Sequence, residues 1–455
     1  MSSKAKQYEI DMCSGPILRK MLLFALPLML SSILQLLFNA ADIVVVGKFA
    51  GDNSLAAVGS NTALINLLTN LFIGLSIGAN VVAARSYGAK AWDDLKRTVH
   101  TSMLLSMVSG LLLMVVGVVG AKQMLIWMQT PREVLPLATV YLRIYFLGMA
   151  STMVYNFGSA LLRAVGDTKR PLYFLLCAGV INVILNLLFV IGFHLDVMGV
   201  AIATVISETV SAVLVLRCLM RESGGIHLEL RAMQIDRKKM MQILRIGLPA
   251  GFQGVVFALS NVVIQSSVNI FGNIIVAGNS AAANLEGFVY MAMNAFYQTT
   301  LSFVSQNFGA GEQKRIHRIV LWGEICVIVT GTLLGNAVVF FGNELLQIYS
   351  NNPEVITAGM VRLHYISMVY ALCGIMDVMV GALRGIGYSI MPMIVSIVGV
   401  CVLRLVWLAT VFQIPQFHRI ETVYLSYPFT WILTSIVYIV FFICVRVKTC
   451  RKQHS

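Results

Sequence analysis

Long runs of apolar residues recur along the whole chain, and polar residues gather in the short segments between them. Clear examples are Met103–Ala121, Leu172–Phe193, Ile325–Phe341 and Trp431–Val445. A helix that rises about 1.5 Å per residue needs about 20 residues to cross the hydrocarbon core of a bilayer. The runs do not alternate apolar and polar residues, as the strands of a membrane β-barrel would. The pattern therefore predicts an all-α membrane protein.

Extending each run to its polar borders gives twelve predicted transmembrane helices. The first six are Ile17–Val46, Leu55–Ala83, Thr98–Ala121, Leu135–Leu162, Pro171–Phe193 and Val197–Met220. The second six are Met240–Phe271, Ser280–Val304, Ile316–Phe341, Val355–Leu383, Ile390–Phe412 and Thr422–Val445. The corresponding domain organisation is an N-terminal tail (1–16), an N-lobe (17–220), a linker (221–239), a C-lobe (240–446) and a C-terminal tail (447–455).

The two predicted lobes resemble each other in sequence. Pro27 matches Pro249, and Asn39 matches Asn261, with the same offset along the chain. RSYGA (85–89) matches QNFGA (306–310), and LRAVGDTKRP (162–171) matches LRGIGYSIMP (383–392), at an offset one residue shorter. Matches in this order predict an internal duplication. Since each lobe has an even number of helices, the repeats enter the membrane from the same side, an arrangement found in two-lobed transporters.

Composition and charge agree with this interpretation. Apolar residues make up 58% of the chain and charged residues 12%, about half the usual share for a soluble domain. With both termini in the cytoplasm, most of the 33 Lys and Arg lie in cytoplasmic segments, as the positive-inside rule requires. The same distribution explains the net charge of +13, so we expect no nucleic-acid partner. The basic start of the chain lacks a small-residue cleavage site, so we expect a tail there rather than a signal peptide.

Several kinds of site are not expected from the sequence. The eight cysteines form no CxxC pair and the seven histidines have no ligand spacing, so no metal centre or cofactor is predicted. The chain has no GxxxxGK[ST] phosphate loop, no GxGD or GxSG signature of an intramembrane enzyme, and no segment resembling a channel filter. We therefore do not expect an enzyme or a channel.

Ionisable and amide side chains inside the predicted helices are the candidate functional residues, because burying them in lipid costs about 2.5–3.5 kcal/mol or more for a charge. In the N-lobe these are Asp42, the i,i+4 pair Asn182 and Asn186, and Thr204, all at a similar depth. Such oxygens could relay a proton or bind a sodium ion. The alternatives are that Asp42 caps the outer end of the first helix or pairs with Lys48, and that the amides and the hydroxyl only join helices by hydrogen bonds.

The C-lobe contributes two further candidates for cation coupling, Asp377 and Glu286. A salt bridge is the alternative role for Asp377, and an interfacial role is the alternative for Glu286. Pro27 removes a helical hydrogen bond in the middle of the first helix, and Pro249 does so in its repeat, so both are predicted hinges. For substrate contacts we select polar, aromatic and methionine side chains, which suit a promiscuous cavity. These are Asn39, Tyr155, Asn156 and Met291.

Together these motifs resemble the multidrug and toxic compound extrusion (MATE) family, close to its bacterial DinF and NorM branches. The resemblance rests on Pro27 with Asp42, on GLSIGANVVAARSYGA (74–89) and LLRAVGDTKRP (161–171), and on QNFGAG (306–311) and GALRGIGYSIMP (381–392). It implies a monomeric antiporter in the bacterial plasma (inner) membrane that exports organic cations, drugs or toxic metabolites by alternating access. Membrane lipids would be its other partners, and H⁺ or Na⁺ would drive it.

The resemblance also assigns roles to individual positions. The family's first-helix aspartate, which couples cations, falls on Asp42. The network of the DinF branch falls on Asn182, Asn186 and Thr204, with Asn186 in place of the usual aspartate. The glutamate that the NorM branch carries in its seventh helix falls on Phe257, whereas its later aspartate matches Asp377. A sodium site would therefore lie at Asp42 or Asp377.

One alternative function remains open at the level of the sequence. A lipid-linked oligosaccharide flippase of the same superfamily would share the duplicated helical architecture. Such a protein would need a broad basic cavity for a diphosphate, and only Arg143, Arg362 and Arg404 lie in the outer halves of the predicted helices. This scarcity favours the antiporter.

Overall fold

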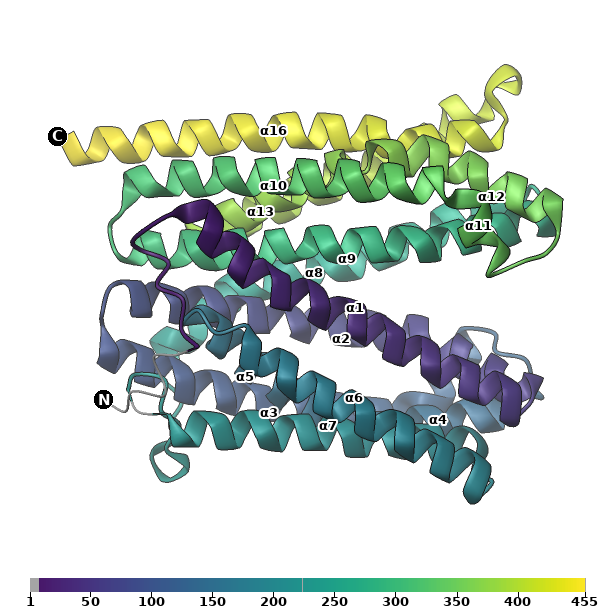
Figure 1. Cartoon of the computed structure of the whole chain (residues 1–455), viewed down its shortest axis with the longest axis horizontal. Helices are drawn as coiled ribbons and strands as arrows, with labels where there is room; N and C mark the ends of the chain where they lie inside the picture. The colour runs from purple at the N-terminus through teal and green to yellow at the C-terminus, as the bar shows by residue number, and fades with distance from the viewer. Residues whose placement is uncertain (1–7, 223, 455) are drawn as a thin grey trace. The chain divides into compact units, whose positions relative to one another are not determined.

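The computed structural model describes residues 8–222 and 224–454, and helices dominate these ranges (Figure 1). Residues 1–7 of the predicted N-terminal tail and Ser455 of the predicted C-terminal tail lie outside the described residues. The described residues contain no β-strand. In lipid a backbone must satisfy its own polar groups, and a helix does so within one segment, so the predicted all-α membrane fold is confirmed.

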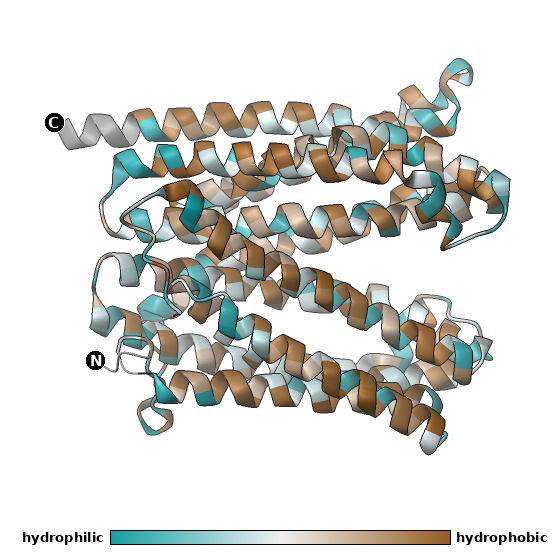
Figure 2. Cartoon of the chain, viewed as in Figure 1, coloured by the Kyte–Doolittle hydropathy of each residue, from teal (hydrophilic) through white to brown (hydrophobic). Residues whose placement is uncertain are grey.

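The helices of the first half follow the predicted order with longer ends. They are α1 (Ile17–Phe49), α2 (Asp52–Gly88), α3 (Trp92–Trp127), α4 (Leu135–Leu147), α5 (Met149–Ala164), α6 (Lys169–Leu187), the π-helix η2 (Leu188–Gly192), α7 (Asp196–Arg221) and the 3₁₀ turn η3 (Leu230–Ala232). Figure 2 shows hydrophobic residues along most of these helices, and hydrophilic residues at many of the turns between them.

The second half begins with three long helices and continues with shorter pieces. They are α8 (Arg237–Asn269), α9 (Asn273–Gly309), α10 (Gln313–Phe340), α11 (Gly342–Gln347), α12 (Pro353–Ile366), η4 (Ser367–Val369), α13 (Ala371–Gly385), α14 (Ile390–Ser396), the π-helix η5 (Ile397–Val402), α15 (Leu403–Ala409), η6 (Val411–Gln413), η7 (Pro415–Phe417) and α16 (Ile420–His454).

The twelve predicted membrane spans can all be located among these elements. In the described residues, 9 helices are long and apolar enough to cross a membrane alone, and two helix pairs do so together. The pairs break after Leu147 and after Val369 and bend by 46° each, at equivalent positions of the two repeats. The twelfth span is α9, which has 37 residues and carries polar side chains such as Glu286, Asn294 and Gln306.

The described chain divides into two compact units. The first unit comprises Leu26–Gly254, the described part of Met1–Ser14, and Ser305–Gly311. In it α3 packs against α2, α4 and α5, and α7 packs against α4, α5 and α6. Large interior side chains of this unit come from α4, for example Tyr141 and Phe146, which lie in an apolar core with residues of α2 and α3.

The second unit comprises Gly15–Ala25, Val255–Val304 and the described part of Glu312–Ser455. In it α13 packs against α10 and α16, and α12 packs against α16. The unit boundaries therefore differ from the lobe boundaries expected from the sequence. The first nine residues of α1 group with the second unit, and α8 up to Gly254 groups with the first.

Glycines explain why the first half of α8 belongs to the first unit. Gly74 and Gly78 on α2 and Gly247 and Gly251 on α8 form two GxxxG motifs that face each other. A Cβ added at Gly74 would lie 2.2 Å from the Gly251 nitrogen, and one at Gly78 would lie 2.3 Å from the Ile243 oxygen. Only glycine lets two helix backbones approach this closely, which is how membrane helices gain packing energy without a hydrophobic effect between them.

The repeated motifs RSYGA and QNFGA contact each other within the first unit. A Cβ at Gly88 would lie 2.0 Å from the Gln306 oxygen, and a Cβ at Gly309 would lie 2.1 Å from the Arg85 oxygen. The two contacts join equivalent positions of the repeat in both directions, as in a two-fold symmetric interface. Arg85 also stacks over the Phe308 ring at 4.8 Å. The motifs therefore keep their glycines for a close backbone contact.

The polar linker after α7 is held on the start of α3. Lys96 forms an ion pair with Glu229 at 3.1 Å, and the Asp236 backbone N–H donates to the Thr101 hydroxyl at 3.0 Å. The hydrogen bond from Lys96 lowers the pKa of Glu229 below its ordinary value. Backbone N–H groups, first that of Lys239, lower the pKa of Asp236 in the same way. Both carboxylates are therefore stabilised in their charged form.

Candidate functional site

Three helices of the first unit bring the predicted N-lobe residues together. Asp42 lies on α1, Asn182 and Asn186 lie on α6, and Thr204 lies on α7. The spacing of four residues places the two asparagines on one face of α6, as expected for a helix. That face packs against α7, so both amides are buried.

The four side chains form one continuous hydrogen-bonded chain. The Asn186 amide nitrogen donates to Asp42 Oδ1 and also to Asn182 Oδ1, the latter at 3.1 Å. The Asn182 amide nitrogen donates to the Thr204 hydroxyl at 3.4 Å, and Thr204 in turn donates to the Val200 carbonyl at 3.0 Å. The network that the sequence could only suggest is therefore present, and Asp42 is its sole carboxylate.

Further polar groups surround this chain. Tyr141 and Tyr145 on α4 are close enough to Asp42 to feel its charge, and their rings stack at 6.0 Å. Glu208 lies one helical turn after Thr204 on α7 and acts electrostatically on Tyr145. Asn186 Oδ1 is buried without a hydrogen-bond partner. An unpaired acceptor next to a carboxylate offers a place for a donor or a cation.

This arrangement can hold one positive charge. A proton would bind to the Asp42 carboxylate, and a sodium ion would need several oxygen ligands of the kind that carboxylates, amides and hydroxyls supply. Among the described residues, no group of three or more His, Cys, Asp or Glu could hold a metal ion. The geometry thus provides one carboxylate and neutral oxygens, without the multiple acids or thiolates of a metal centre.

Glu286, the first C-lobe candidate, lies in a buried ion pair. Arg362 on α12 donates from Nε to Glu286 Oε1 at 3.1 Å and from Nη2 to Oε2 at 2.7 Å. The third arm of the guanidinium donates to Asn279 Oδ1 at 2.7 Å, an oxygen that the Tyr424 hydroxyl also contacts at 3.3 Å. Both carboxylate oxygens of Glu286 are therefore engaged by a fixed charge from the protein itself.

Asp377, the second C-lobe candidate, has different partners. It lies on α13, beside the Tyr290 hydroxyl of α9 and with the charge of Arg384 nearby. Its Oδ2 atom is buried without a hydrogen-bond partner. The structure thus separates the two candidates by role, since Glu286 is fully paired and Asp377 retains an open acceptor.

The four residues selected as substrate contacts lie in varied surroundings. Asn39 is exposed on α1, and Met291 is half-buried on α9. The Tyr155 hydroxyl donates to the Pro171 carbonyl at 3.1 Å, and the Asn156 amide donates to the Thr152 carbonyl of its own helix at 2.9 Å. The Tyr155 hydroxyl and the Asn156 amide nitrogen therefore already have partners in the backbone.

Both predicted hinge prolines lie inside continuous helices, Pro27 in α1 and Pro249 in α8. Proline has no N–H to donate to the carbonyl four residues earlier, so each helix lacks one stabilising bond there. A boundary of the compact units lies near each proline, between Ala25 and Leu26 just before Pro27, and between Gly254 and Val255 about one and a half turns after Pro249. Each helix thus passes from one unit to the other close to its proline.

Sequence reasoning missed partners that are distant along the chain. It did not connect Tyr141 or Tyr145 with Asp42, or Asn279 and Arg362 with Glu286. Glu208 is a weaker candidate from the sequence, as an acid inside the sixth predicted helix, and its spacing of four from Thr204 places both on one face of α7. No comparable signal links α4 to α1 or α12 to α9.

Comparisons with known proteins agree with the duplicated architecture. The family model MatE matches twice, over residues 27–188 and 249–410, and each match begins at a hinge proline. The probable multidrug resistance protein YoeA of Bacillus subtilis is 27% identical over 83% of this chain and 83% of its own. A protein of Shewanella oneidensis described as an FAD transporter is 26% identical over 96% of this chain and 97% of its own.

A crystal structure of a MATE protein in complex with MaL6 has a TM-score of 0.90 to this chain, at 19% identity. The alignment covers 97% of this chain and 98% of that one. A likeness at this identity shows a shared fold. The two family matches cover most of the sequence, and the proteins that it resembles are transporters rather than enzymes. This chain therefore belongs to the MATE family of membrane transporters.

Proposed function

We propose that this chain is an antiporter that exports organic cations, drugs or toxic metabolites and takes up H⁺ or Na⁺ in exchange. It works by alternating access in a bacterial plasma (inner) membrane, with both termini in the cytoplasm. It acts as a monomer in contact with membrane lipids, without a cofactor and without nucleic acid. The names of its relatives support drug export, and the distribution of Lys and Arg supports the orientation.

The observation that carries this proposal is the hydrogen-bonded chain from Asp42 to Thr204, in which the two asparagines are buried and the two ends are half-buried. A carboxylate and two amides inside membrane helices are costly, and such groups usually mark an ion pathway. Structural hydrogen bonds between helices would satisfy Asn182 and Thr204, but they leave Asn186 Oδ1 unpaired beside Asp42. That unpaired oxygen favours a site in which a cation comes and goes.

The hinge provides a physical link between the ion and a change of conformation. Asp42 and Pro27 lie on the same helix, α1, about four turns apart. A neutral Asp42 is a weaker acceptor for the Asn186 amide than a charged one, because charge-assisted hydrogen bonds are about twice as strong. Loading with a cation therefore loosens α1 from α6 and favours a different bend at Pro27. A ligand shifts such an equilibrium only through this kind of differential contact.

The C-lobe ion pair does not fit the role of a coupling site. Its carboxylate is already neutralised by Arg362, so an incoming proton or sodium ion would have to displace a bidentate guanidinium. Of the two C-lobe candidates, Asp377, which keeps an open acceptor, is the one that could take part in coupling. We therefore assign the principal ion site to Asp42 and a secondary role to Asp377.

The test is efflux from proteoliposomes with a proton gradient or a sodium gradient imposed separately, using an organic cationic dye such as ethidium. Wild-type protein should transport under one of the two gradients, and that gradient identifies the ion. Asp42→Asn should reduce gradient-driven transport by at least about 100-fold, whereas Asp196→Asn, a residue at the first turn of α7, should not. Equal transport by Asp42→Asn and wild type would reject the assignment. Efflux of no cationic dye under either gradient would favour the flippase alternative.

A further inference from the structure

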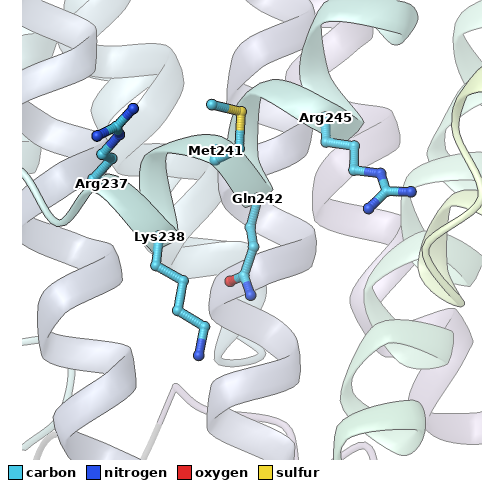
Figure 3. Close-up of a pocket in the computed structure, with 5 residues that line it drawn as sticks. All are labelled: Arg237, Lys238, Met241, Gln242 and Arg245. Atoms are coloured by element: carbon cyan, nitrogen blue, oxygen red, sulfur yellow. The ribbon is translucent and has the colours of Figure 1, made fainter.

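A basic pocket lies on the first turns of α8, apart from the candidate coupling site. Arg237, Lys238, Met241, Gln242 and Arg245 line it, and its volume is about 520 Å³. Figure 3 shows these five side chains projecting from successive turns of the helix. All five residues are exposed, so three positive charges face the surroundings within about two helical turns.

These three charges are not neutralised by the described part of the protein. Arg237, Lys238 and Arg245 form no ion pair with any described residue, and no acid lines the pocket. The nearest acid in sequence, Asp236, accepts the backbone N–H groups of Lys238 and Lys239 and lies 3.7 Å from Arg97. The pocket therefore keeps an uncompensated positive potential.

Lys239, which follows the first two residues of the pocket, differs from them because its charge is paired within the protein. Lys239 is buried and forms an ion pair with Asp94 of α3 at 3.0 Å. It faces the protein, whereas Arg237, Lys238 and Arg245 face away from it. Structural pairing thus accounts for one of the four basic residues at the start of α8 and leaves the other three available.

Apolar residues continue the same exposed face along the helix. Met241 is 55% exposed, Leu248 is 42% exposed and Phe252 is 50% exposed. With 3.6 residues per turn, these positions and Arg245 fall on one strip of α8, about a third of a turn around the helix from Gly247 and Gly251, which pack on α2. The strip therefore carries its charges in the first turns, with Met241 among them, and the exposed apolar side chains of Leu248 and Phe252 after Arg245.

We propose that this face of α8 binds one anionic phospholipid. The headgroup phosphate lies between Arg237, Lys238 and Arg245, and an acyl chain lies along Met241, Leu248 and Phe252. A basic pocket at the end of a membrane helix recognises a headgroup by charge, and each Lys or Arg near an anionic surface strengthens the binding. The apolar stripe favours a lipid over a soluble phosphate, because only a lipid can cover both parts of the face.

The proposed lipid site lies next to the turn of α8 that Pro249 weakens. Arg245 precedes Pro249 by four residues, so its carbonyl is the one that the proline leaves without a helical donor. A lipid that holds the turns before Pro249 therefore restrains the part of α8 that ends at the weakened turn.

The test uses full-length protein and titrates phosphatidylglycerol or phosphatidylcholine of identical acyl chains, with bound lipid counted by native mass spectrometry. The variant is Arg237→Gln/Lys238→Gln/Arg245→Gln. The matched control is Arg217→Gln/Lys314→Gln/Arg318→Gln, which removes three exposed charges that the predicted topology places on the same side. The wild type and the control should bind one more phosphatidylglycerol than the variant at equal lipid, with affinity on the order of ten-fold or more above the variant. Phosphatidylcholine should bind equally to all three.

Three outcomes would overturn the proposal. Equal phosphatidylglycerol binding by the variant and the wild type would show that the pocket is not the site. An equal loss of phosphatidylglycerol binding in the variant and the control would show a general effect of positive charge. Displacement of the extra lipid by millimolar inorganic phosphate would identify a soluble-anion site instead. If the triple variant is poorly folded, Arg245→Gln alone, compared with Arg318→Gln, gives the same test with a smaller expected loss.

Discussion

The buried pair of Glu286 and Arg362 permits a prediction with a defined magnitude. Replacing Arg362 by methionine keeps a long side chain but removes all three donors that reach Glu286 and Asn279. The remaining carboxylate is only 3% exposed, so it would be left buried without its counter-charge. Breaking a buried ion pair in this way costs about 3–5 kcal/mol. Arg362→Met should therefore be strongly destabilised.

Replacing both partners should have a different result. In Glu286→Leu/Arg362→Met no buried charge is left over, and such replacements of whole pairs are often neutral or stabilising by about 1–4 kcal/mol. Asn279 Oδ1, which loses Arg362 as a donor, would still accept a hydrogen bond from the Tyr424 hydroxyl at 3.3 Å. We expect the double variant to regain most of the stability that Arg362→Met loses.

Thermal unfolding in detergent and dye efflux from proteoliposomes measure the two consequences. The unfolding midpoint should fall in Arg362→Met and return close to the wild-type value in the double variant. Gradient-driven efflux by the double variant should stay within about three-fold of the wild type, because the pair is structural. If the double variant is as unstable as Arg362→Met, the unpaired Glu286 carboxylate is not the cause of the lost stability. If it is stable but does not transport, Glu286 has a coupling role after all.

Two further predictions concern packing and the linker. Gly251→Ala places a Cβ 2.2 Å from the Leu71 oxygen and should lower stability by about 1–3 kcal/mol, whereas Gly59→Ala, with no atom within 4 Å, should have little effect; thermal unfolding of both variants checks this. The pKa values of Glu229 and Asp236 are lower in the folded protein than their ordinary values of 4.5 and 3.8. The two carboxylates therefore stabilise the folded linker fully at a pH above these ordinary values. This stabilisation is lost as the pH falls through the lower pKa values of the folded state. Hydrogen exchange over residues 226–236, corrected for the intrinsic rate, should therefore rise at acidic pH and stay constant above pH 4.5. A pH-independent exchange rate would contradict this reasoning.

The linear pattern of residues was enough to determine the fold class and its repeat. Apolar runs of membrane length admit only a few structures in lipid, and helices are the one that needs no partner strand. The offset between Pro27 and Pro249, and that between RSYGA (85–89) and QNFGA (306–310), indicate the duplication from the sequence alone. Local spacing also placed Asn182 and Asn186 on one face, because the period of a helix is fixed.

The boundaries of the compact units depended on the tertiary structure. Nothing local in α1 or α8 shows that each helix belongs to one unit before its proline region and to the other after it. That division arises from close contacts such as those of Gly74 with Gly251, which join segments distant along the chain. Helix packing in lipid depends on the shape of both surfaces, and one sequence segment specifies only its own.

The roles of the candidate acids were also decided in three dimensions. Asp42, Asp377 and Glu286 are equivalent in the sequence, since each is an acid inside an apolar segment. The structure gives them different partners, an amide network for Asp42, a tyrosine for Asp377 and a bidentate arginine for Glu286. A carboxylate can respond to a passing cation only if its charge is not already neutralised, and its neutralising partner comes from another helix. The sequence could therefore name the acids, and the packing of helices decided which of them can couple to an ion.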